Sequence, residues 1–312
     1  MIVKGGIAIE SLWSRIKSHR QLFVMLLPCL IWFVVFAYVP MGGLLLAFKE
    51  FKFNAGILHS PWVGLRYFEN FFAYPGAWQL VLNTIIVGLI KIVLYFPFPI
   101  ILALMLNAVR RRGLKSVVQT ISYLPHFLSW VVVAAFTFRI LSPNDGIANQ
   151  LLAWLGGSGE TFFMMEEKYF YLVMFLTFVW KGIGWGSIIY LAAITNVDPT
   201  LYEAAQIDGA NKWQQTVHVT LSGIRTTIGI LLILDLSGLL STGYEQNFLL
   251  RTAGNSNAAD ILDVYVLRTG MMQGQYGYAT AVGMMQGVIG LVMVLLINKA
   301  VAKLTDREAS LW

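Results

Sequence analysis

Long stretches without a charged side chain constrain this 312-residue chain more than any other feature. Between Arg20 and Lys49 there are 28 consecutive residues without Asp, Glu, Lys or Arg, and between Arg268 and Lys299 there are 30. A helix needs about 20 mostly apolar residues to cross the hydrocarbon core of a bilayer. Only 12% of all residues are charged and 57% are hydrophobic, which is too little charge to coat a soluble domain of this size. We therefore predict an integral membrane protein.

Further runs of this kind predict six membrane-spanning helices in an all-α fold. Membrane-spanning strands would need segments of about ten residues with alternating polarity, whereas these runs are longer and apolar on every side. The first run is too long for the apolar part of a cleaved signal peptide. Residues 22–299 then form a transmembrane domain between the terminal segments 1–21 and 300–312. We place the spans at about Leu22–Ala47 and Trp78–Leu106, between Lys115 and Arg139, at Tyr169–Thr195 and Thr226–Leu250, and between Arg268 and Lys299.

Lysine and arginine residues give the orientation of these spans, because cytoplasmic loops carry an excess of them. The side that holds both termini has 13 of them and the other side has 6. We therefore expect both termini in the cytoplasm, and the net charge of +6 indicates membrane orientation rather than nucleic-acid binding. The four histidines are scattered without the spacing of metal ligands, so no metal site is predicted.

Residues 196–225, between the fourth and fifth spans, have the wrong composition for a membrane helix. Asp198 followed by Pro199 is typical of a helix start, with an Asp cap before a proline at the first helical position. The pattern predicts two short amphipathic helices joined by a bend at Gly209, on the cytoplasmic surface. Such a hairpin is more often a lipid-surface or intramolecular packing element than a docking site. The residues that share one face of its first helix are Leu201, Ala204, Ala205 and Asp208.

This hairpin resembles the EAA loop of binding-protein-dependent ABC importer permeases. The residues that carry the likeness are Glu203, Ala204, Ala205, Ile207, Asp208, Gly209, Ala210, Trp213, Thr220 and Leu221. In that family the loop forms a coupling helix that docks in a cleft of the ATPase subunit. The resemblance thus assigns the ATPase contact to Glu203, Ala204, Ala205, Asp208 and Gly209. One departure is Ser222, where the family usually has a proline, and it puts the rigidity of the exit into the fifth span in question.

Other segments extend the resemblance over nearly the whole chain and narrow it to the carbohydrate-uptake branch. They are Tyr38–Met41, Trp62–Leu65, Ser122–Phe127, Trp185–Tyr190 and Ser310–Trp312. Similar permeases handle fragments of alginate or rhamnogalacturonan. The resemblance therefore implies a type I ABC importer permease in the inner membrane of a bacterium. Its cargo would be oligosaccharides, acidic fragments of alginate or pectin among them.

The same resemblance implies a set of partners. These are a second, homologous permease subunit, two ABC ATPase subunits that bind ATP and Mg²⁺, an extracytoplasmic solute-binding protein and the surrounding lipid. This chain has no glycine-rich phosphate loop ending in Gly-Lys-Ser/Thr, so we expect no cofactor and no ATP hydrolysis on it. The expected mechanism is alternating access, in which the docked hairpin transmits the movement of the ATPases to the fourth and fifth spans.

Polar and aromatic residues within the spans are candidates for the translocation path, because charge at that depth usually faces a cavity or a partner. The candidates are Lys91, Trp180, Lys181, Trp185, Tyr190, Asp235, Tyr244, Glu245, Gln246 and Asn247, with Asn83 and His126 as weaker ones. An ion pair of Asp235 with Lys91 or Lys181, packing of the aromatic rings, and a solvated helix end at 244–247 stay open as structural alternatives. His126 is expected to bond a carbonyl freed by the kink at Pro125.

Three other functions remain as alternatives. A secondary transporter driven by an ion gradient would use Lys91, Lys181 and Asp235 as a relay and would contain inverted repeats, which are not evident by eye. A membrane-embedded glycosyl-processing enzyme would need paired carboxylates at a membrane face, and the acidic residues are scattered. A purely structural membrane subunit would leave the hairpin motif without an explanation.

Overall fold

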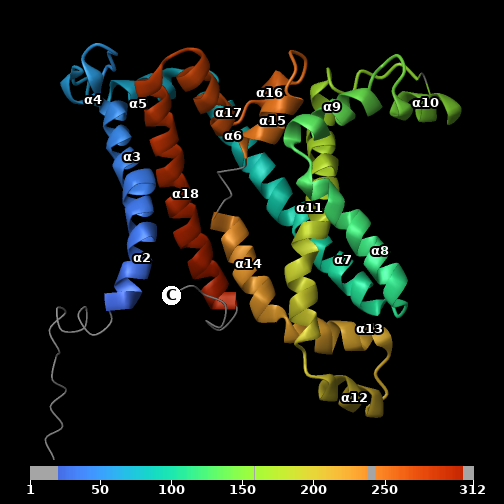
Figure 1. Ribbon diagram of the computed structural model, residues 1–312. Helices are drawn as coiled ribbons and strands as arrows, with labels where there is room; N and C mark the ends of the chain where they lie inside the picture. The colour runs from blue at the N-terminus through green and yellow to red at the C-terminus, as the bar shows by residue number, and fades with distance from the viewer. Residues whose placement is uncertain (1–19, 158, 238–242, 305–312) are drawn as a thin grey trace, which may run out of the picture.

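The computed structural model describes residues 20–157, 159–237 and 243–304, so most of each predicted terminal segment lies outside the described residues. Within these ranges the chain forms helices joined by turns, and the only strand-like pairing is an isolated bridge between Lys49 and Trp62. Most long helices run between two ends of the molecule (Figure 1). One end, here called the hairpin end, carries α12 (Pro199–Ile207) and α13 (Lys212–Gln214). The opposite end, here called the loop end, carries short helices. These are α4 (Gly56–His59), α5 (Arg66–Ala73), α10 (Ile147–Trp154), α16 (Ser256–Ala259) and α17 (Leu262–Leu267).

Three stretches are long and apolar enough to cross a membrane: Arg20–Phe48, Ala77–Ala108 and Glu167–Thr195. The first consists of α2 (Arg20–Phe33), η1 (Val34–Tyr38), α3 (Val39–Met41) and η2 (Gly42–Phe48). The second consists of α6 (Ala77–Leu89), η3 (Ile90–Tyr95) and α7 (Pro97–Ala108), and the third is α11 (Glu167–Thr195). The prediction of a span in each of these three places is confirmed.

The π-helical turns in these spans lie beside prolines. Segment η1 comes just before Pro40, and η3 comes just before Pro97 and Pro99. Proline has no N–H to donate and its ring clashes with the preceding turn, so the backbone hydrogen bonds of the helix must adjust locally. Membrane helices tolerate such adjustments as long as the freed backbone groups find other partners.

The predicted third span, between Lys115 and Arg139, is not one helix. Helix α8 (Arg112–Tyr123) continues into η4 (Leu124–Phe127), and α9 (Trp130–Ile140) then turns away by 102°. The predicted fifth span, Thr226–Leu250, includes helix α14 (Arg225–Ser237) and helix α15 (Tyr244–Leu250). Gly243, directly before α15, has a φ of 75° and is not helical. Helix α14 meets the preceding η5 (Gln215–Leu221) at 63°.

The described residues thus contain three uninterrupted spans, or up to five if each bent pair is one span. The C-terminal helix α18 (Tyr276–Leu304) follows η6 (Arg268–Met272) and has 29 residues. That length corresponds to about 43 Å at 1.5 Å per residue. A total of six spans stays a prediction.

The break between α8 and α9 is held by Lys181 of α11. The Lys181 ammonium donates to the carbonyl oxygens of His126 and Leu128, each at 2.6 Å. Both carbonyls lie at the end of η4, where the last carbonyl groups of a helix have no helical N–H partner. Ser129 starts α9 by accepting a hydrogen bond from the Val132 N–H. A half-buried donor on a neighbouring helix therefore replaces the backbone bonds that the bend removes.

Helix α11 is the central packing element, in contact with α7 and α8 over much of its length. A Cβ at Gly184 would overlap the backbone carbonyl of Ser122 on α8, so only glycine permits this approach. At the hairpin end a buried cluster joins α7 and α11 to Ile224, the residue just before α14. The members of this cluster are Ala103, Leu106, Tyr190, Leu191, Ile194 and Ile224.

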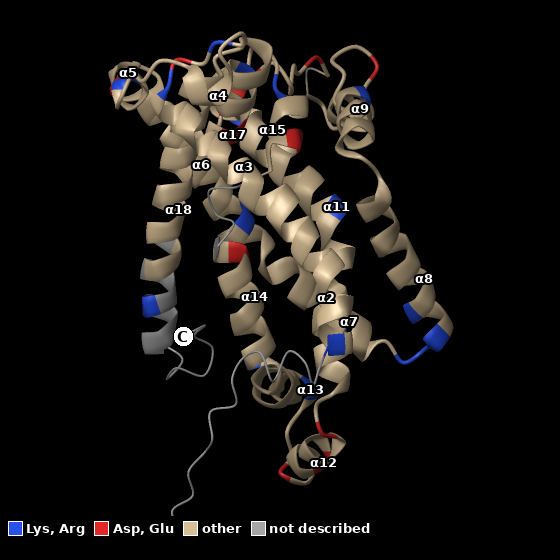
Figure 2. Cartoon of the chain, turned by 60° about the vertical axis from the view of Figure 1, so that its left-hand side comes forward, with Lys and Arg blue, Asp and Glu red and all other residues tan. Residues whose placement is uncertain are grey.

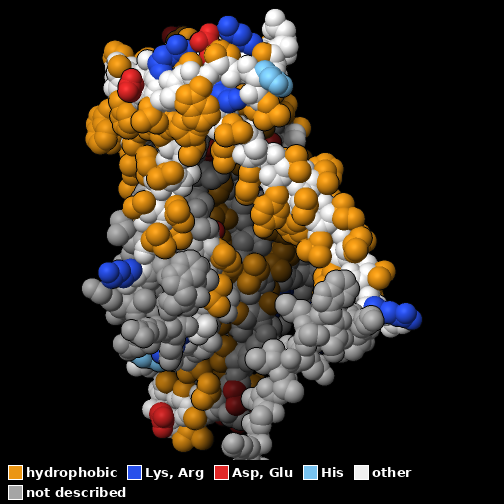
Figure 3. Space-filling model, turned by 90° about the vertical axis from the view of Figure 1, so that its left-hand side faces the viewer, with side chains coloured by type: hydrophobic (Ala, Val, Ile, Leu, Met, Phe, Trp, Pro, Cys, Tyr) orange, Lys and Arg blue, Asp and Glu red, His pale blue; other side chains and the backbone are white. Residues whose placement is uncertain are grey.

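The surface between the two ends is apolar. Charged side chains gather at the loop end and at the hairpin end, and few lie between them (Figure 2). A side view shows hydrophobic side chains over the middle of the molecule, below a charged rim (Figure 3). Many large hydrophobic side chains of α2 and η1 are more than half exposed. A continuous exposed apolar band of this kind fits a hydrocarbon environment.

Replacing Gly184 with alanine is expected to destabilise the protein by about 1–3 kcal/mol, because the new methyl group meets a backbone that cannot rotate away. Thermal denaturation of the detergent-purified protein measures this as a lower melting temperature. Gly113→Ala in α8 is the matched control, since nothing lies within 4 Å of its Cβ position. Equal melting of the two variants would contradict the close contact between α8 and α11.

Candidate functional site

The predicted hairpin is present, and its two arms begin with well-formed caps. The Asp198 carboxylate accepts a hydrogen bond of 2.9 Å from the Thr200 N–H, and Pro199 follows at the first helical position. This hydrogen bond lowers the pKa of Asp198. The cap is therefore charged at neutral pH, and its contribution is lost only when the pH falls through that lowered pKa. Asn211 and Gln214 form a reciprocal capping box at the start of the second arm.

Gly209 makes the bend between the arms. Its φ of 78° lies in the left-handed region, where a side chain is strained. The Ala210 N–H donates to the Ala205 carbonyl at 2.9 Å and the Gly209 N–H to the Gln206 carbonyl at 3.1 Å. This is the Schellman arrangement that ends a helix. The two arms are also joined by a hydrogen bond of 3.0 Å between the Tyr202 and Thr220 hydroxyl groups.

The hairpin presents an unpartnered surface at its end of the molecule. Glu203, Ala204, Asp208 and Gly209 are exposed, and Ala205 is half-buried. Two large apolar side chains stand out from the same region: Ile207 is 87% exposed and Trp213 is 74% exposed. A cavity of about 260 Å³ lies in the elbow, lined by Ala205, Asp208, Gly209, Ala210, Gln214, His218 and Val219. A fixed bend with exposed apolar residues around a notch is suited to contact with another protein.

The five hairpin residues singled out from the sequence are thus close together in space. They belong to α12 and the bend, which leave directly from α11 and lead through η5 into α14. The buried cluster around Ile224 fastens this exit to α7 and α11. A displacement of the hairpin would therefore act on those spans without an intervening flexible linker.

The structure gives the intramembrane lysines other partners than Asp235. Lys181 is engaged by the carbonyls of His126 and Leu128. Lys91 lies over the Phe178 ring, 4.5 Å from its centroid, and is attracted by the carboxylate of Asp263. Asp235 is exposed on α14. The ion pair of Asp235 with either lysine, which the sequence left open as an alternative, is therefore not formed in this structure.

The aromatic candidates on α11 have distinct environments. Trp185 is 48% exposed and stacks on the His126 ring, with centroids 4.5 Å apart and planes at 3°. His126 does not bond a freed carbonyl as predicted, because Lys181 takes that role and the His126 ring packs on Trp185. Trp180 is 47% exposed, whereas Tyr190 belongs to the buried cluster at the hairpin end.

The polar cluster 244–247 divides into two pairs. Tyr244 and Glu245 are exposed, and Tyr244 lines an apolar groove of about 780 Å³ between α17, η6 and α18. Gln246 and Asn247 are buried, and the Gln246 amide donates to the Met174 carbonyl at 2.7 Å and to the Thr177 hydroxyl at 2.9 Å. In this conformation Gln246 ties α15 to α11 and does not face an open path.

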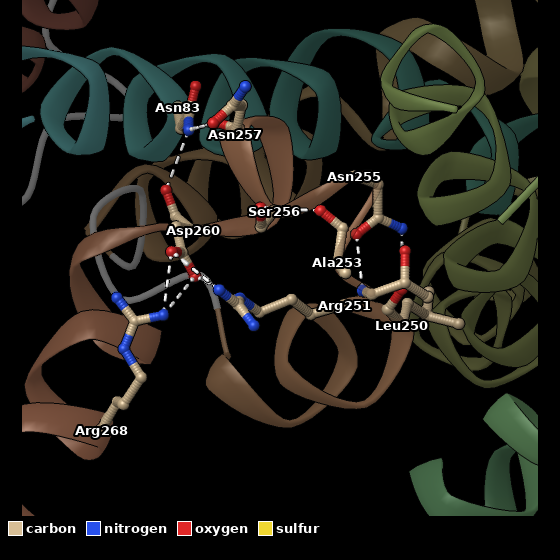
Figure 4. A network of polar contacts seen from close by, with 10 residues as sticks. Asn83, Leu250, Arg251, Ala253, Asn255, Ser256, Asn257, Asp260 and Arg268 are labelled. Atoms are coloured by element: carbon tan, nitrogen blue, oxygen red, sulfur yellow. Dashed lines mark hydrogen bonds and ion pairs between the residues drawn. The ribbon is translucent and has the colours of Figure 1, made fainter. Parts of the chain in front are cut away.

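Sequence reasoning missed a polar network at the loop end, centred on Asp260 (Figure 4). The Asp260 carboxylate pairs with both Arg251 and Arg268, at 2.6 and 3.0 Å. Asn83 of α6, fully buried, donates to the backbone carbonyls of Asp260 and Asn257. The arginines are 17 positions apart, with α16 and α17 between them, and no spacing rule would have joined them.

Comparison with known proteins identifies the class of this arrangement. Residues 95–306 match the family model described as "Binding-protein-dependent transport system inner membrane component". The chain is 42% identical over 294 residues to the polygalacturonan/rhamnogalacturonan transport system permease protein YteP of Bacillus subtilis (strain 168). That match covers 94% of this chain and 91% of YteP. This chain is also 39% identical to the protein LplB of the same organism, over 95% of this chain and 92% of LplB.

Solved structures agree with these relatives. A chain of a bacterial ABC transporter involved in the import of the acidic polysaccharide alginate superposes with a TM-score of 0.87 and 38% identity. The superposition covers 95% of this chain and all of that one. A second structure, with the same TM-score, holds a bacterial alginate ABC transporter in complex with an alginate pentasaccharide-bound periplasmic protein. Sequence and fold together show that the chain belongs to the family of inner membrane components of binding-protein-dependent transport systems, in the group of carbohydrate ABC permeases.

Proposed function

We propose that this chain is a permease subunit of an ATP-driven importer that moves oligosaccharides, including acidic ones, into a bacterial cell. The similarity to YteP over 94% of the chain carries this proposal. The related alginate importer has the same fold, with a TM-score of 0.87. Both relatives are named for polymers that contain acidic sugars.

The energy for transport enters through the hairpin. Glu203, Ala204, Ala205, Asp208 and Gly209 form the surface that contacts an ABC ATPase, which binds ATP and Mg²⁺. The exposed Ile207 and Trp213 support this role, since both would be buried in a protein contact. A contact of this kind shifts the pore between inward-open and outward-open states only if the ATP-bound ATPase favours one of them.

The remaining assembly follows from the exposed surfaces. A second, homologous permease covers surfaces that this chain leaves open, including the N-terminal span, whose most apolar window has no buried residue. A solute-binding protein docks at the loop end, as a periplasmic protein does in the complex of the alginate transporter. The hairpin end faces the cytoplasm with both termini, in accord with 13 against 6 basic residues. Residues 22–299 form the six-span domain, with cytoplasmic segments 1–21 and 300–312.

The translocation path is lined by exposed candidates rather than by the buried ones. Trp180, Trp185, Asp235, Tyr244 and Glu245 are accessible in the single chain. Sugar rings stack on aromatic faces. Sugar hydroxyl groups donate hydrogen bonds to carboxylates. Lys91, Lys181, Gln246 and Asn247 support the walls, since each is engaged by its own chain or buried.

A carrier driven by an ion gradient has less support. Its relay would consist of Lys91, Lys181 and Asp235, and these three groups do not contact one another. Lys181 donates two hydrogen bonds at the break between α8 and α9, and these bonds would have to open if Lys181 carried protons. The relatives are binding-protein-dependent transport components and ABC importers.

The double variant Glu203→Gln/Gly209→Ala tests the coupling role. The first change removes a charge from the docking surface and the second strains the bend. In proteoliposomes that contain the full assembly, ATP-driven uptake should fall about tenfold, a typical size for a coupling free energy. ATP hydrolysis by the ATPase subunits should continue.

The matched control is Glu160→Gln/Gly156→Ala. It makes the same chemical changes in the connection between α10 and α11, where Gly156 also has a positive φ, of 87°. Uptake by the control should equal that of the wild type. Unchanged uptake by the hairpin variant would show that the energy enters elsewhere.

A further inference from the structure

The charge balance around Asp260 is uneven. Asp260 is 16% exposed and is the single carboxylate that pairs with Arg251 and Arg268 within the described part of the chain. One carboxylate offsets one of the two guanidinium charges, so the cluster keeps an excess positive charge. The two arginine side chains are still 30% and 26% exposed. Two partly buried guanidinium groups that share one carboxylate are incompletely neutralised, and an anion that arrives from outside would complete the neutralisation.

The two arginines are not equivalent. Arg251 uses its Nε, at 2.6 Å, and one terminal nitrogen, at 3.3 Å, in a two-point contact with Asp260. Arg268 reaches the same carboxylate through one terminal nitrogen only, at 3.0 and 3.4 Å from its two oxygens. A guanidinium group has five N–H donors in a planar fork. Arg268 therefore keeps unused donors that match a second carboxylate.

Arg268 is also held in place before any ligand arrives. Its guanidinium carbon lies 5.9 Å from the centroid of the Tyr265 ring. Asp260, its partner, is fixed by the buried Asn83 of α6, which donates to the Asp260 backbone carbonyl at 2.9 Å. Figure 4 shows how Asp260 and Asn83 join the two arginines to α6. A donor that is already oriented loses little conformational freedom when it binds.

We propose that Arg268, positioned by Asp260 and Tyr265 and assisted by the charge of Arg251, binds a carboxylate of an acidic oligosaccharide on its way into the permease. The inference rests on the proposed function, because it places the cluster on the side from which cargo enters. It assigns selection of acidic over neutral sugars to a specific residue. The ligand class is a sugar acid, whose planar carboxylate accepts two hydrogen bonds from the guanidinium fork.

The test compares an oligogalacturonide with the same oligomer after reduction of its carboxyl groups to alcohols. Binding to the detergent-purified assembly is measured by calorimetry, and ATP-driven uptake is measured in proteoliposomes. Arg268→Gln should weaken binding of the acidic oligomer about tenfold, the loss expected for one charge-assisted contact. The KM of this variant for uptake of the acidic oligomer should rise by a similar factor. For the reduced oligomer, the variant and the wild type should have the same affinity and the same KM.

Arg66→Gln is the matched control, because it also removes a positive charge from the loop end, at an exposed pair with Glu50. It should leave the binding of both oligomers unchanged, and any effect on uptake should be equal for the two. Arg268→Lys should recover only part of the binding, since lysine keeps the charge without the fork. An equal loss for both oligomers, or no loss for either, would overturn the assignment. If the wild type binds the acidic oligomer but does not take it up with ATP, the proposed function is wrong. The calorimetric comparison of the wild type with Arg268→Gln would still test the role of Arg268.

Discussion

Every backbone N–H and C=O group within a membrane must find a partner inside the protein, and this constraint shapes the molecule. It requires helices, and it makes each proline or break a place where another group has to intervene. The clearest case is Lys181, whose ammonium bonds the carbonyls of His126 and Leu128 at the 102° bend between η4 and α9. A charged residue that suggests a transport function from its depth alone serves here to stabilise a bend.

The two ends of the molecule have different chemistry, and this difference fits a division of labour. The hairpin end has a capped bend, exposed apolar side chains and a direct connection into α11 and α14. The loop end has a network of charged and amide groups around Asp260. A surface of the first kind is suited to protein contact, and one of the second kind to polar cargo. Helix α11 packs along both α7 and α8 and so connects the two ends mechanically.

Much of this architecture could be predicted from local sequence, and the failures have a common cause. The hairpin bend was predictable because Asp198, Pro199 and Gly209 act through their own backbone conformations. The uninterrupted spans were predictable from long apolar runs, two of which contain a single lysine near the middle, Lys91 or Lys181. The break after Leu128 was not, because no charged residue between Lys115 and Arg139 interrupts the run there. Its stabilising group, Lys181, is 53 positions away in the chain. The network around Asp260 escaped prediction for the same reason, since tertiary packing brings its members together.

We propose that nucleotide hydrolysis on a separate subunit powers transport and that this energy reaches the pore through protein contact. The most direct measurement is uptake of an oligosaccharide by proteoliposomes that contain the complete assembly, with ionophores present to abolish every ion gradient. Uptake should continue under these conditions while ATP is supplied, and it should stop when the ATPase subunits are left out. Uptake that follows an imposed ion gradient in the absence of the ATPase would contradict ATP-powered transport.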